Sequence, residues 1–174
     1  KGKKIMSKII DKDRFYYNSK FLGSPQGRSV RILSEYYGPL KRLQQKKIAD
    51  TIVFFGSARI SSQEDAQMAL DNISKNADSQ TIKRLNVDLK MSRYYEEARS
   101  LAGKFTTWSK GLKGTKRRYI ICSGGGPGIM EASNRGAAEA GGINVGLTIS
   151  LPFESSGNKW ISDDLDMKFH YFFM

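Results

Sequence analysis

Two short glycine-containing segments hold the residues whose types and spacing suit the binding of an anion. Gly56-Ser57-Ala58-Arg59 follows one apolar run, and Gly124-Gly125-Gly126-Pro127-Gly128 follows another and leads into an alanine-rich segment. Glycines let a backbone approach a ligand closely, and the N–H groups and dipole at the start of a helix attract phosphate or carboxylate. The predicted ligand-binding residues are Gly56, Ser57, Arg59, Gly124, Gly125, Gly126, Gly128, Met130 and Glu131.

The second glycine segment matches neither of two common phosphate-binding motifs. The pattern G-x-G-x-x-G counted from Gly124 requires glycine where Ile129 stands, and a Walker A motif requires lysine and then serine or threonine after its last glycine. A tight turn that only packs a helix on a sheet is therefore the alternative to a ligand site.

The elements around these segments alternate between strand and helix. Apolar runs predict strands at Thr51 to Phe55, Tyr119 to Cys122 and Ile143 to Ile149, and a helix leads from the second glycine segment to Gly141-Gly142. This alternation predicts an α/β fold, a Rossmann-like doubly wound parallel sheet. In that fold both glycine segments lie at the carboxyl ends of strands, where ligands bind.

The remaining segments complete a predicted organisation in two parts. Residues 1–47 form a basic and aromatic N-terminal arm with a helix from Arg28 to Lys47 that Pro39 should kink or split. Residues 48–174 form the Rossmann-like nucleotide-binding domain. Asn76 to Lys90 lacks periodicity and is predicted to be a surface loop, with Ser92 capping the helix that follows. The apolar run from Phe169 to Met174 predicts a core strand, and we expect further sequence to follow it.

The charge of the chain is strongly positive. Lysine and arginine number 29 against 17 aspartates and glutamates in 174 residues, which gives a formal net charge of +12 and would attract polyanions. The basic residues fall mainly in 1–12, 41–47 and 104–118, outside the glycine segments. We interpret them as a basic tail and solvated helix faces, and we do not expect nucleic acid as a partner.

The composition also bears on compartment and redox chemistry. There is no transmembrane run or signal peptide, so we expect a cytoplasmic protein without a membrane partner. The single cysteine, Cys122, lies in an apolar run and is expected to be a small buried side chain, not a nucleophile, and it excludes a disulfide within the chain. We expect neither a cofactor nor a bound metal ion.

Several segments together resemble the lonely-guy family of Rossmann-like nucleotide-binding proteins, formerly described as lysine decarboxylases. The segments are Thr51 to Arg59, Tyr94 to Ala98, Gly124 to Ala132 with Asn134-Arg135-Gly136-Ala137, and, as in longer bacterial members, Arg28 to Lys47, Leu151-Pro152-Phe153-Glu154 and Phe169 to Met174. The resemblance implies hydrolysis of the N-glycosidic bond of nucleoside 5′-monophosphates such as AMP, giving free base and ribose 5-phosphate. It also implies a homodimer or a larger assembly of dimers.

One part of the family pattern is absent. The family motif Pro-Gly-Gly-x-Gly-Thr-x-x-Glu does not occur in the sequence, and the resemblance implies that the catalytic arginine and glutamate would lie beyond Met174, so the catalytic residues are unknown here and we expect a truncated chain. Hydrolysis through an oxocarbenium-like sugar requires a carboxylate. The candidates are Glu131, Glu139, Glu154, Asp163, Asp164 and Asp166. A nucleotide-binding protein without turnover is the alternative function, and a nucleic-acid-binding module is a third.

Overall fold

Four parallel strands form the centre of the computed structural model, which describes residues 14–73, 77–150 and 157–171. The strands are β1 (Thr51–Phe54), β2 (Ile120–Ser123), β3 (Asn144–Ile149) and β4 (Asp166–Phe169). They pair in the order β1-β2-β3-β4, with Ile52 opposite Ile121, Cys122 opposite Val145 and Leu147 opposite Met167. The predicted α/β class with a Rossmann-like parallel sheet is confirmed.

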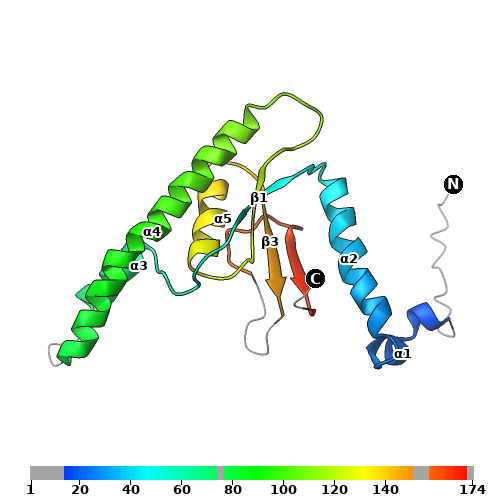
Figure 1. The fold of residues 1–174 in the computed structure, drawn as a ribbon, viewed down its shortest axis with the longest axis horizontal. Helices are drawn as coiled ribbons and strands as arrows, with labels where there is room; N and C mark the ends of the chain where they lie inside the picture. The colour runs from blue at the N-terminus through cyan, green and yellow to red at the C-terminus, as the bar shows by residue number, and fades with distance from the viewer. Residues whose placement is uncertain (1–13, 74–76, 151–156, 172–174) are drawn as a thin grey trace, which may run out of the picture.

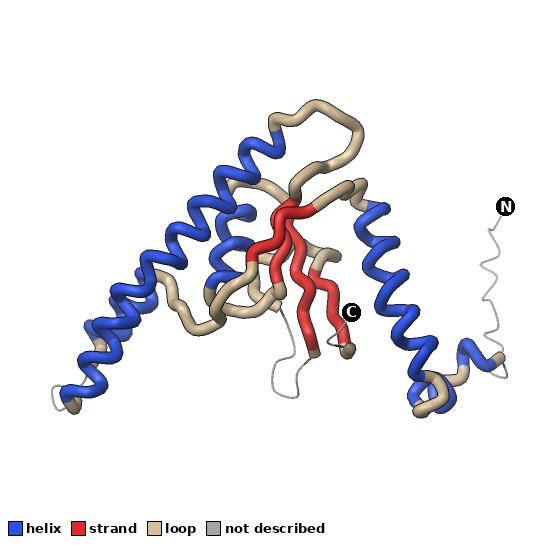
Figure 2. Tube along the Cα trace, in the orientation of Figure 1, coloured by secondary structure: helices blue, strands red, loops and turns tan. Residues whose placement is uncertain are grey.

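Helices flank the sheet on both sides (Figures 1 and 2). They are η1 (Phe15–Tyr17), α1 (Ser19–Gly23), α2 (Arg28–Gln45), α3 (Gln63–Asp71), α4 (Ser79–Lys110) and α5 (Ile129–Glu139). Helices α3, α4 and α5 connect β1 to β2 and β2 to β3, and they lie on one side, whereas α2 lies on the other (Figure 1). Both crossovers step in the same direction across the sheet, and because crossovers are right-handed they place their helices on the same face.

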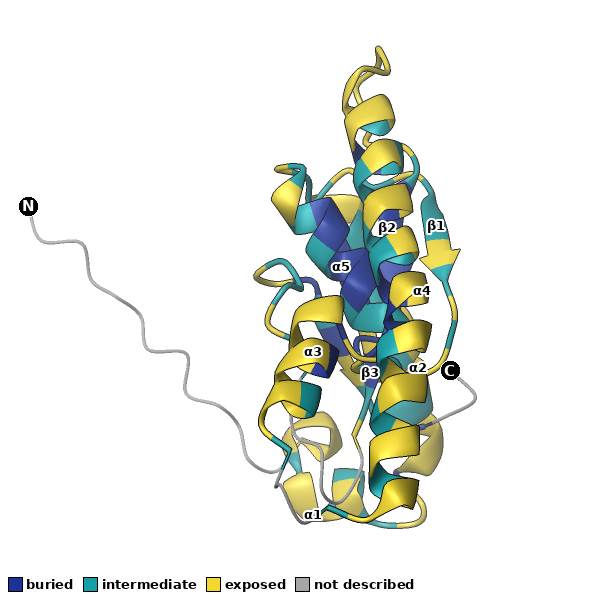
Figure 3. Ribbon diagram, turned by 90° about the vertical axis from the view of Figure 1, so that its left-hand side faces the viewer, coloured by how far each residue is buried: buried dark blue, intermediate teal, exposed yellow. Residues whose placement is uncertain are grey.

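Alternating residues of the strands form two apolar clusters, one on each face of the sheet. Ile121 packs with Ala102 of α4 and Ala137 of α5, and the buried residues on α5 line this interface (Figure 3). On the opposite face the cluster consists of Ile120, Cys122, Val145, Leu165 and Met167, with Leu43 of α2 packed against it. The period of two along each strand therefore decides which helix a side chain meets.

Cys122 lies in the second of these clusters. Its side chain is 3% exposed and is not in a disulfide bond, and burial raises the pKa of its thiol to about 11. Because the thiolate is the nucleophilic form, burial leaves the group inert at neutral pH. The expectation of a small buried side chain is confirmed.

The predicted surface loop over Asn76 to Lys90 is wrong, because α4 begins at Ser79. The side chain of Asp78 caps the helix by accepting hydrogen bonds from the N–H and the hydroxyl of Thr81, at 2.8 and 2.7 Å. The first half of α4 extends past the sheet beside α3 (Figure 1), so it needs few apolar positions and shows little periodicity. Ser92, the predicted cap, is buried within α4 and donates to the carbonyl of Leu89 at 2.7 Å.

The ends of the described chain differ in detail from expectation. Helix α2 continues through Pro39 instead of splitting there. The last strand is Asp166–Phe169, earlier than the predicted Phe169 to Met174, of which residues 172–174 lie outside the described residues. After β4 the N–H groups of His170 and Tyr171 donate to the carboxylate of Glu35, at 2.8 and 3.0 Å, which attaches α2 beside this strand.

The N-terminal arm is helical where it is described: η1 and α1 precede α2, and α2 confirms the helix predicted from Arg28. Residues 1–13, which include most of the first basic stretch, lie outside the described residues. No helix in the described ranges has the length and apolar character needed to cross a bilayer.

Candidate functional site

The two glycine segments meet at the carboxyl edge of the sheet. The N–H of Ile129, the first residue of α5, donates to the carbonyl oxygen of Ser57 at 3.0 Å. Gly128 has φ of +73°, and a Cβ there would overlap the Ser57 oxygen and lie 2.8 Å from the Ala58 Cα. Only glycine fits this contact, so the turn after β1 and the turn after β2 form one surface.

Three further predicted residues shape the turn after β1. A Cβ on Gly56 would lie 2.7 Å from the Cβ of Ile129, so Gly56 allows the start of α5 to approach β1. Ser57 and Arg59 are exposed, and the N–H of Arg59 donates to the Ser57 hydroxyl oxygen at 3.1 Å. The hydroxyl hydrogen of Ser57 finds no acceptor in the described ranges and is available to an anion.

The glycines of the second segment differ in role. The N–H of Gly125 donates to Ser123 Oγ at 3.0 Å, so it is not available to a ligand. Gly125 has φ of +74°, and a Cβ there would overlap Thr148 Oγ1, so the turn leaves no room for a side chain at this position. By contrast, the N–H groups of Gly124, Gly126 and Met130 have no acceptor among the residues that the structure describes. These are the donors that the turn leaves for a ligand.

A buried polar network holds the second glycine segment in place. Asn134 of α5 is fully buried; its Oδ1 accepts from Ser123 Oγ at 2.6 Å, and its Nδ2 donates to Asn144 Oδ1 at 2.9 Å. Asn158 Nδ2 donates to the carbonyls of Gly125 and Gly126 and to Asn134 Oδ1, at 3.1, 3.2 and 3.0 Å. Sequence reasoning assigned no role to these asparagines. The available signal was asparagine inside an otherwise small and apolar helix face.

Glu131 lies in the first turn of α5 and is partly buried. Its Oε1 accepts a hydrogen bond from the hydroxyl of Tyr95 in α4 at 3.1 Å. Burial raises the pKa of Tyr95 to about 12, so the hydroxyl stays a donor at all physiological pH values. The Glu131 carboxylate is therefore held at the helix start by a neutral group, where the helix dipole favours its negative charge.

A surface ion network near the far end of α5 ties the same two helices together. Glu139 accepts from Arg99 Nε at 2.6 Å and from Arg135 Nε at 2.9 Å, and these bonds, that from Arg99 first, hold the pKa of Glu139 below its ordinary value. Glu139 is thus engaged in packing α4 against α5, away from the glycine turn.

The other candidate acids are dispersed. Asp163 and Asp164 are exposed before β4, at the opposite edge of the sheet, and Asp164 pairs with Lys46 at 3.3 Å. Asp166 accepts from Thr148 Oγ1 at 2.7 Å and from the N–H of Gly157 at 3.4 Å, which fastens the segment after residue 156. Glu154 lies outside the described residues. Of the described candidates, Glu131 alone belongs to the first turn of α5.

No metal centre is formed by the described residues, because no three His, Cys, Asp or Glu side chains among them are grouped to hold an ion. The site at the glycine turns is therefore built from backbone donors, hydroxyls, one exposed arginine and one carboxylate. Such a set suits a phosphorylated organic ligand.

Part of this region matches the model of a known protein family. Residues 111–168, which contain β2, the second glycine segment, α5 and β3, match the model of the SLOG cluster4 family. The SLOG superfamily includes Rossmann-type proteins of the lonely-guy kind, and the match indicates a nucleotide-related function in general terms. Membership of the lonely-guy family itself stays a prediction. No curated protein matches the chain.

Proposed function

We propose that this chain binds a nucleoside 5′-monophosphate across the turns that follow β1 and β2, and that the protein hydrolyses its N-glycosidic bond. The observation that carries the proposal is the contact of Ile129 N–H with Ser57, which joins the two turns into one surface, beside N–H groups that find no acceptor among the described residues. A single-turn phosphate loop would not need the close approach at Gly128.

The 5′-phosphate fits the start of α5. There the N–H groups of Gly126 and Met130 would donate to the phosphate, with the positive end of the helix dipole behind them. Such an arrangement stabilises a negative charge by about 0.3–1 kcal/mol, and by up to about 2 kcal/mol when partly buried. The Ser57 hydroxyl and the Arg59 guanidinium, both exposed on the neighbouring turn, add a hydrogen bond and a positive charge.

The proposed reaction adds water to C1′ of the ribose and breaks the C1′–N bond. The bonding pair leaves with the base, which takes up a proton, and ribose 5-phosphate remains. A carboxylate stabilises the oxocarbenium-like sugar and orients the water. Glu131, which Tyr95 holds at the start of α5, is one described acid near this surface, and we propose that turnover requires the motif Pro-Gly-Gly-x-Gly-Thr-x-x-Glu in addition to it.

Binding without turnover is the second candidate. It is favoured by hydrogen bonds that already engage the acids near the glycine turn. Glu131 accepts from Tyr95, and Asp166 accepts from Thr148 Oγ1, which lies against Gly125.

Gly126→Ala keeps the backbone N–H but should weaken AMP binding about 10- to 100-fold, because the added Cβ obstructs the approach of the phosphate to that N–H, and a hydrogen bond to a charged group is worth about that much. A Cβ at Gly126 meets only the terminal methyl of Met130 at 2.9 Å, a flexible group that can move, so the fold should tolerate the change. Calorimetric titration with AMP measures the effect. Gly38→Ala, in open space on α2, is the matched control and should bind AMP as the unaltered chain does. Equal affinities for all three proteins would rule out the glycine turn as the phosphate site.

Turnover separates the two candidate functions. Loss of a transition-state-stabilising group costs on the order of 100-fold or more in rate. We expect these 174 residues alone to bind AMP without releasing adenine, and a protein in which Pro-Gly-Gly-x-Gly-Thr-x-x-Glu follows them to release adenine and ribose 5-phosphate. Chromatography after overnight incubation with AMP measures both. Adenine from the 174 residues, abolished by Glu131→Gln, would assign the chemistry to Glu131, whereas no adenine from the longer protein would favour binding without turnover.

A further inference from the structure

Two basic stretches that are far apart in the sequence lie side by side at the amino edge of the sheet. Lys46 and Lys47 follow α2, and Lys116 and Arg117 precede β2. A parallel bridge joins Ile48 to Arg117: the Arg117 N–H donates to the Lys47 carbonyl at 2.8 Å, and an Arg117 guanidinium N–H donates to the Lys46 carbonyl at 3.1 Å. The backbone therefore fixes four cationic residues on two adjacent segments.

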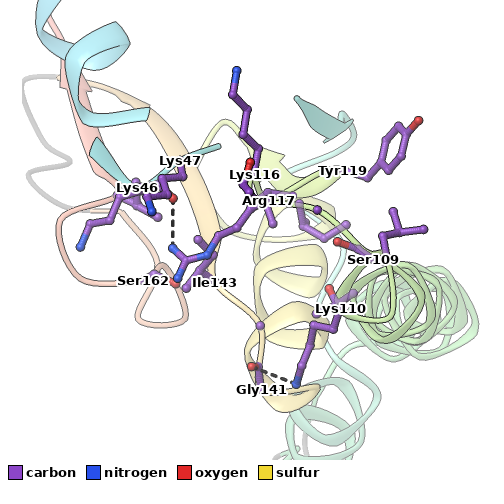
Figure 4. A pocket seen from close by; sticks show the side chains of 18 of the residues that line it. Lys46, Lys47, Ser109, Lys110, Lys116, Arg117, Tyr119, Gly141, Ile143 and Ser162 are labelled. Carbon is purple, nitrogen blue, oxygen red and sulfur yellow. Dashed lines mark hydrogen bonds between the residues drawn. The ribbon is translucent and has the colours of Figure 1, made fainter. Parts of the chain in front are cut away.

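These residues line a cavity of about 840 Å³, at the opposite edge of the sheet from the glycine turns. Figure 4 shows their side chains around it. The charged residues that line it are Lys46, Lys47, Lys110, Lys116, Arg117 and Asp163. Five positive charges thus face one negative charge.

Few of these charges are neutralised within the described chain. Lys46 pairs with Asp164, and Lys110 Nζ donates to the carbonyls of Ala140 and Gly141 at the end of α5, at 3.0 and 3.2 Å. Lys47 and Lys116 are exposed, and their ammonium groups find no acceptor among the described residues. Like charges held within a Debye length of about 10 Å repel each other, so this arrangement favours occupation by an anion.

The backbone at the same place is unusual. Lys47 and Tyr119, both in the lining, have φ of +55° and +54°, in the left-handed region that side chains rarely adopt. Such conformations cost stability and persist where the surrounding structure enforces them, often at binding sites. Here the enforced geometry is the one that brings the two basic segments together.

An exposed aromatic surface adjoins the cations. Trp108 of α4 is 51% exposed, and its ring lies against that of Tyr119 with centroids 5.0 Å apart. The Arg118 guanidinium lies over the Tyr119 ring at 4.8 Å. Trp108 directly precedes Ser109 and Lys110, which line the cavity. Aromatic rings beside a basic groove are the surface on which unpaired bases stack.

We propose that this amino-edge cavity binds single-stranded nucleic acid, with phosphodiester groups along Lys47, Lys116 and Arg117 and a base stacked on Trp108. The cations are spread over several segments and are bordered by an aromatic ring, which suits a chain of phosphates and bases better than one compact polyphosphate. For the lysines and arginine at this edge, the proposal differs from the interpretation of residues 41–47 and 104–118 as solvated faces. The proposal does not depend on the function of the glycine turns.

The test uses fluorescence anisotropy to measure the binding of a labelled oligo(dT) at several salt concentrations. A length of about 12 nucleotides is within the range that a single-strand-binding site covers. The variant Lys47→Gln/Lys116→Gln should bind at least roughly tenfold more weakly at low salt, and the slope of log affinity against log salt should fall by about 1.4, since each phosphate contact contributes about 0.7 for a single strand. The matched control Lys83→Gln/Arg84→Gln removes the same charge from an exposed pair on the first half of α4 and should leave both quantities unchanged.

Tryptophan fluorescence tests the stacking contact separately. In a Trp160→Phe background Trp108 is the only tryptophan, and the change removes an indole N–H that has no partner. Oligo(dT) should quench this fluorescence. Trp108→Ala should lower the affinity for oligo(dT), measured by anisotropy, by roughly 5- to 100-fold. Three results would overturn the proposal: equal losses in the pocket and control variants, saturable tripolyphosphate binding without oligonucleotide affinity, or displacement of the oligonucleotide by AMP.

Discussion

Gly136→Ala is expected to lower the free energy of unfolding by about 2 kcal/mol or more, although alanine is the better helix former. Gly136 lies where α5 crosses α4, and a Cβ there would overlap the Arg99 carbonyl oxygen and lie 2.8 Å from the Arg99 carbonyl carbon. Those atoms belong to the backbone of α4 and cannot rotate away. Overpacking typically costs about 1–3 kcal/mol, and contact with backbone atoms that cannot move places this site at the upper end or beyond, so about 2 kcal/mol or more remains after a helix-propensity gain of about 1 kcal/mol.

The measurement is the urea midpoint at unchanged m-value. Gly38→Ala is the control, because it makes the same change within a helix where no atom beyond its own helix backbone and its chain neighbours lies within 4 Å of the added Cβ. Pro39 follows directly and disfavours a Cβ in the helical region, which offsets the propensity gain, so we expect a change of less than about 0.5 kcal/mol. If both variants lower the midpoint by the same amount, α4 and α5 do not cross as closely as described.

Asn134→Ala should cost about 3 kcal/mol and also weaken AMP binding. The substitution removes the acceptor of Ser123 and the donor to Asn144 Oδ1, both fully buried, and each buried group left unpaired costs about 1–3 kcal/mol. It also removes one bond that holds Asn158 against the carbonyls of Gly125 and Gly126, so the glycine turn loses part of its support.

Ser133→Ala is the neighbouring control. Ser133 is as deeply buried as Asn134, but its hydroxyl donates only to the Met130 carbonyl one turn earlier in the same helix, at 2.8 Å. We expect it to cost at most about 1 kcal/mol and to leave AMP binding unchanged. Denaturant unfolding and calorimetry on both variants make the comparison. An Asn134→Ala protein as stable as Ser133→Ala would show that the network contributes no more than a local hydroxyl.

The strands and the glycine turns could be predicted because their signals are local. An apolar run such as Thr51 to Phe55 that breaks at glycine indicates a strand and turn whatever its surroundings, and parallel pairing then brings the two turns to one edge. The contact between Gly128 and Ser57 could not be predicted, because a glycine in the sequence does not indicate which neighbouring segment approaches it.

The first half of α4 could not be predicted from periodicity. A helix that extends beyond the sheet with only α3 beside it needs no continuous apolar stripe, and its start is marked only by the Asp78 cap. The asparagine network and the basic cavity could not be predicted from the sequence for a different reason. Each depends on residues that are distant in sequence, such as Asn134 with Asn158 or Lys47 with Arg117, and meet only through the sheet order.

The strand order β1-β2-β3-β4 leaves β1 at one edge of the sheet, where a further strand could pair. The β4 side is bordered by α2, through Glu35 at one end and the Lys46–Asp164 pair at the other, whereas no described element borders β1, where Val53 is exposed. A strand added to this sheet, from the same or another chain, therefore finds an edge beside β1 that no described element borders. If a parallel strand of the same chain joins there, the winding reverses and its connecting helix lies on the face opposite α4 and α5. Adjacent crossovers that diverge to opposite faces leave a crevice at the carboxyl end of the strand between them. That strand would be β1, and the crevice would open directly over Gly56 and Ser57.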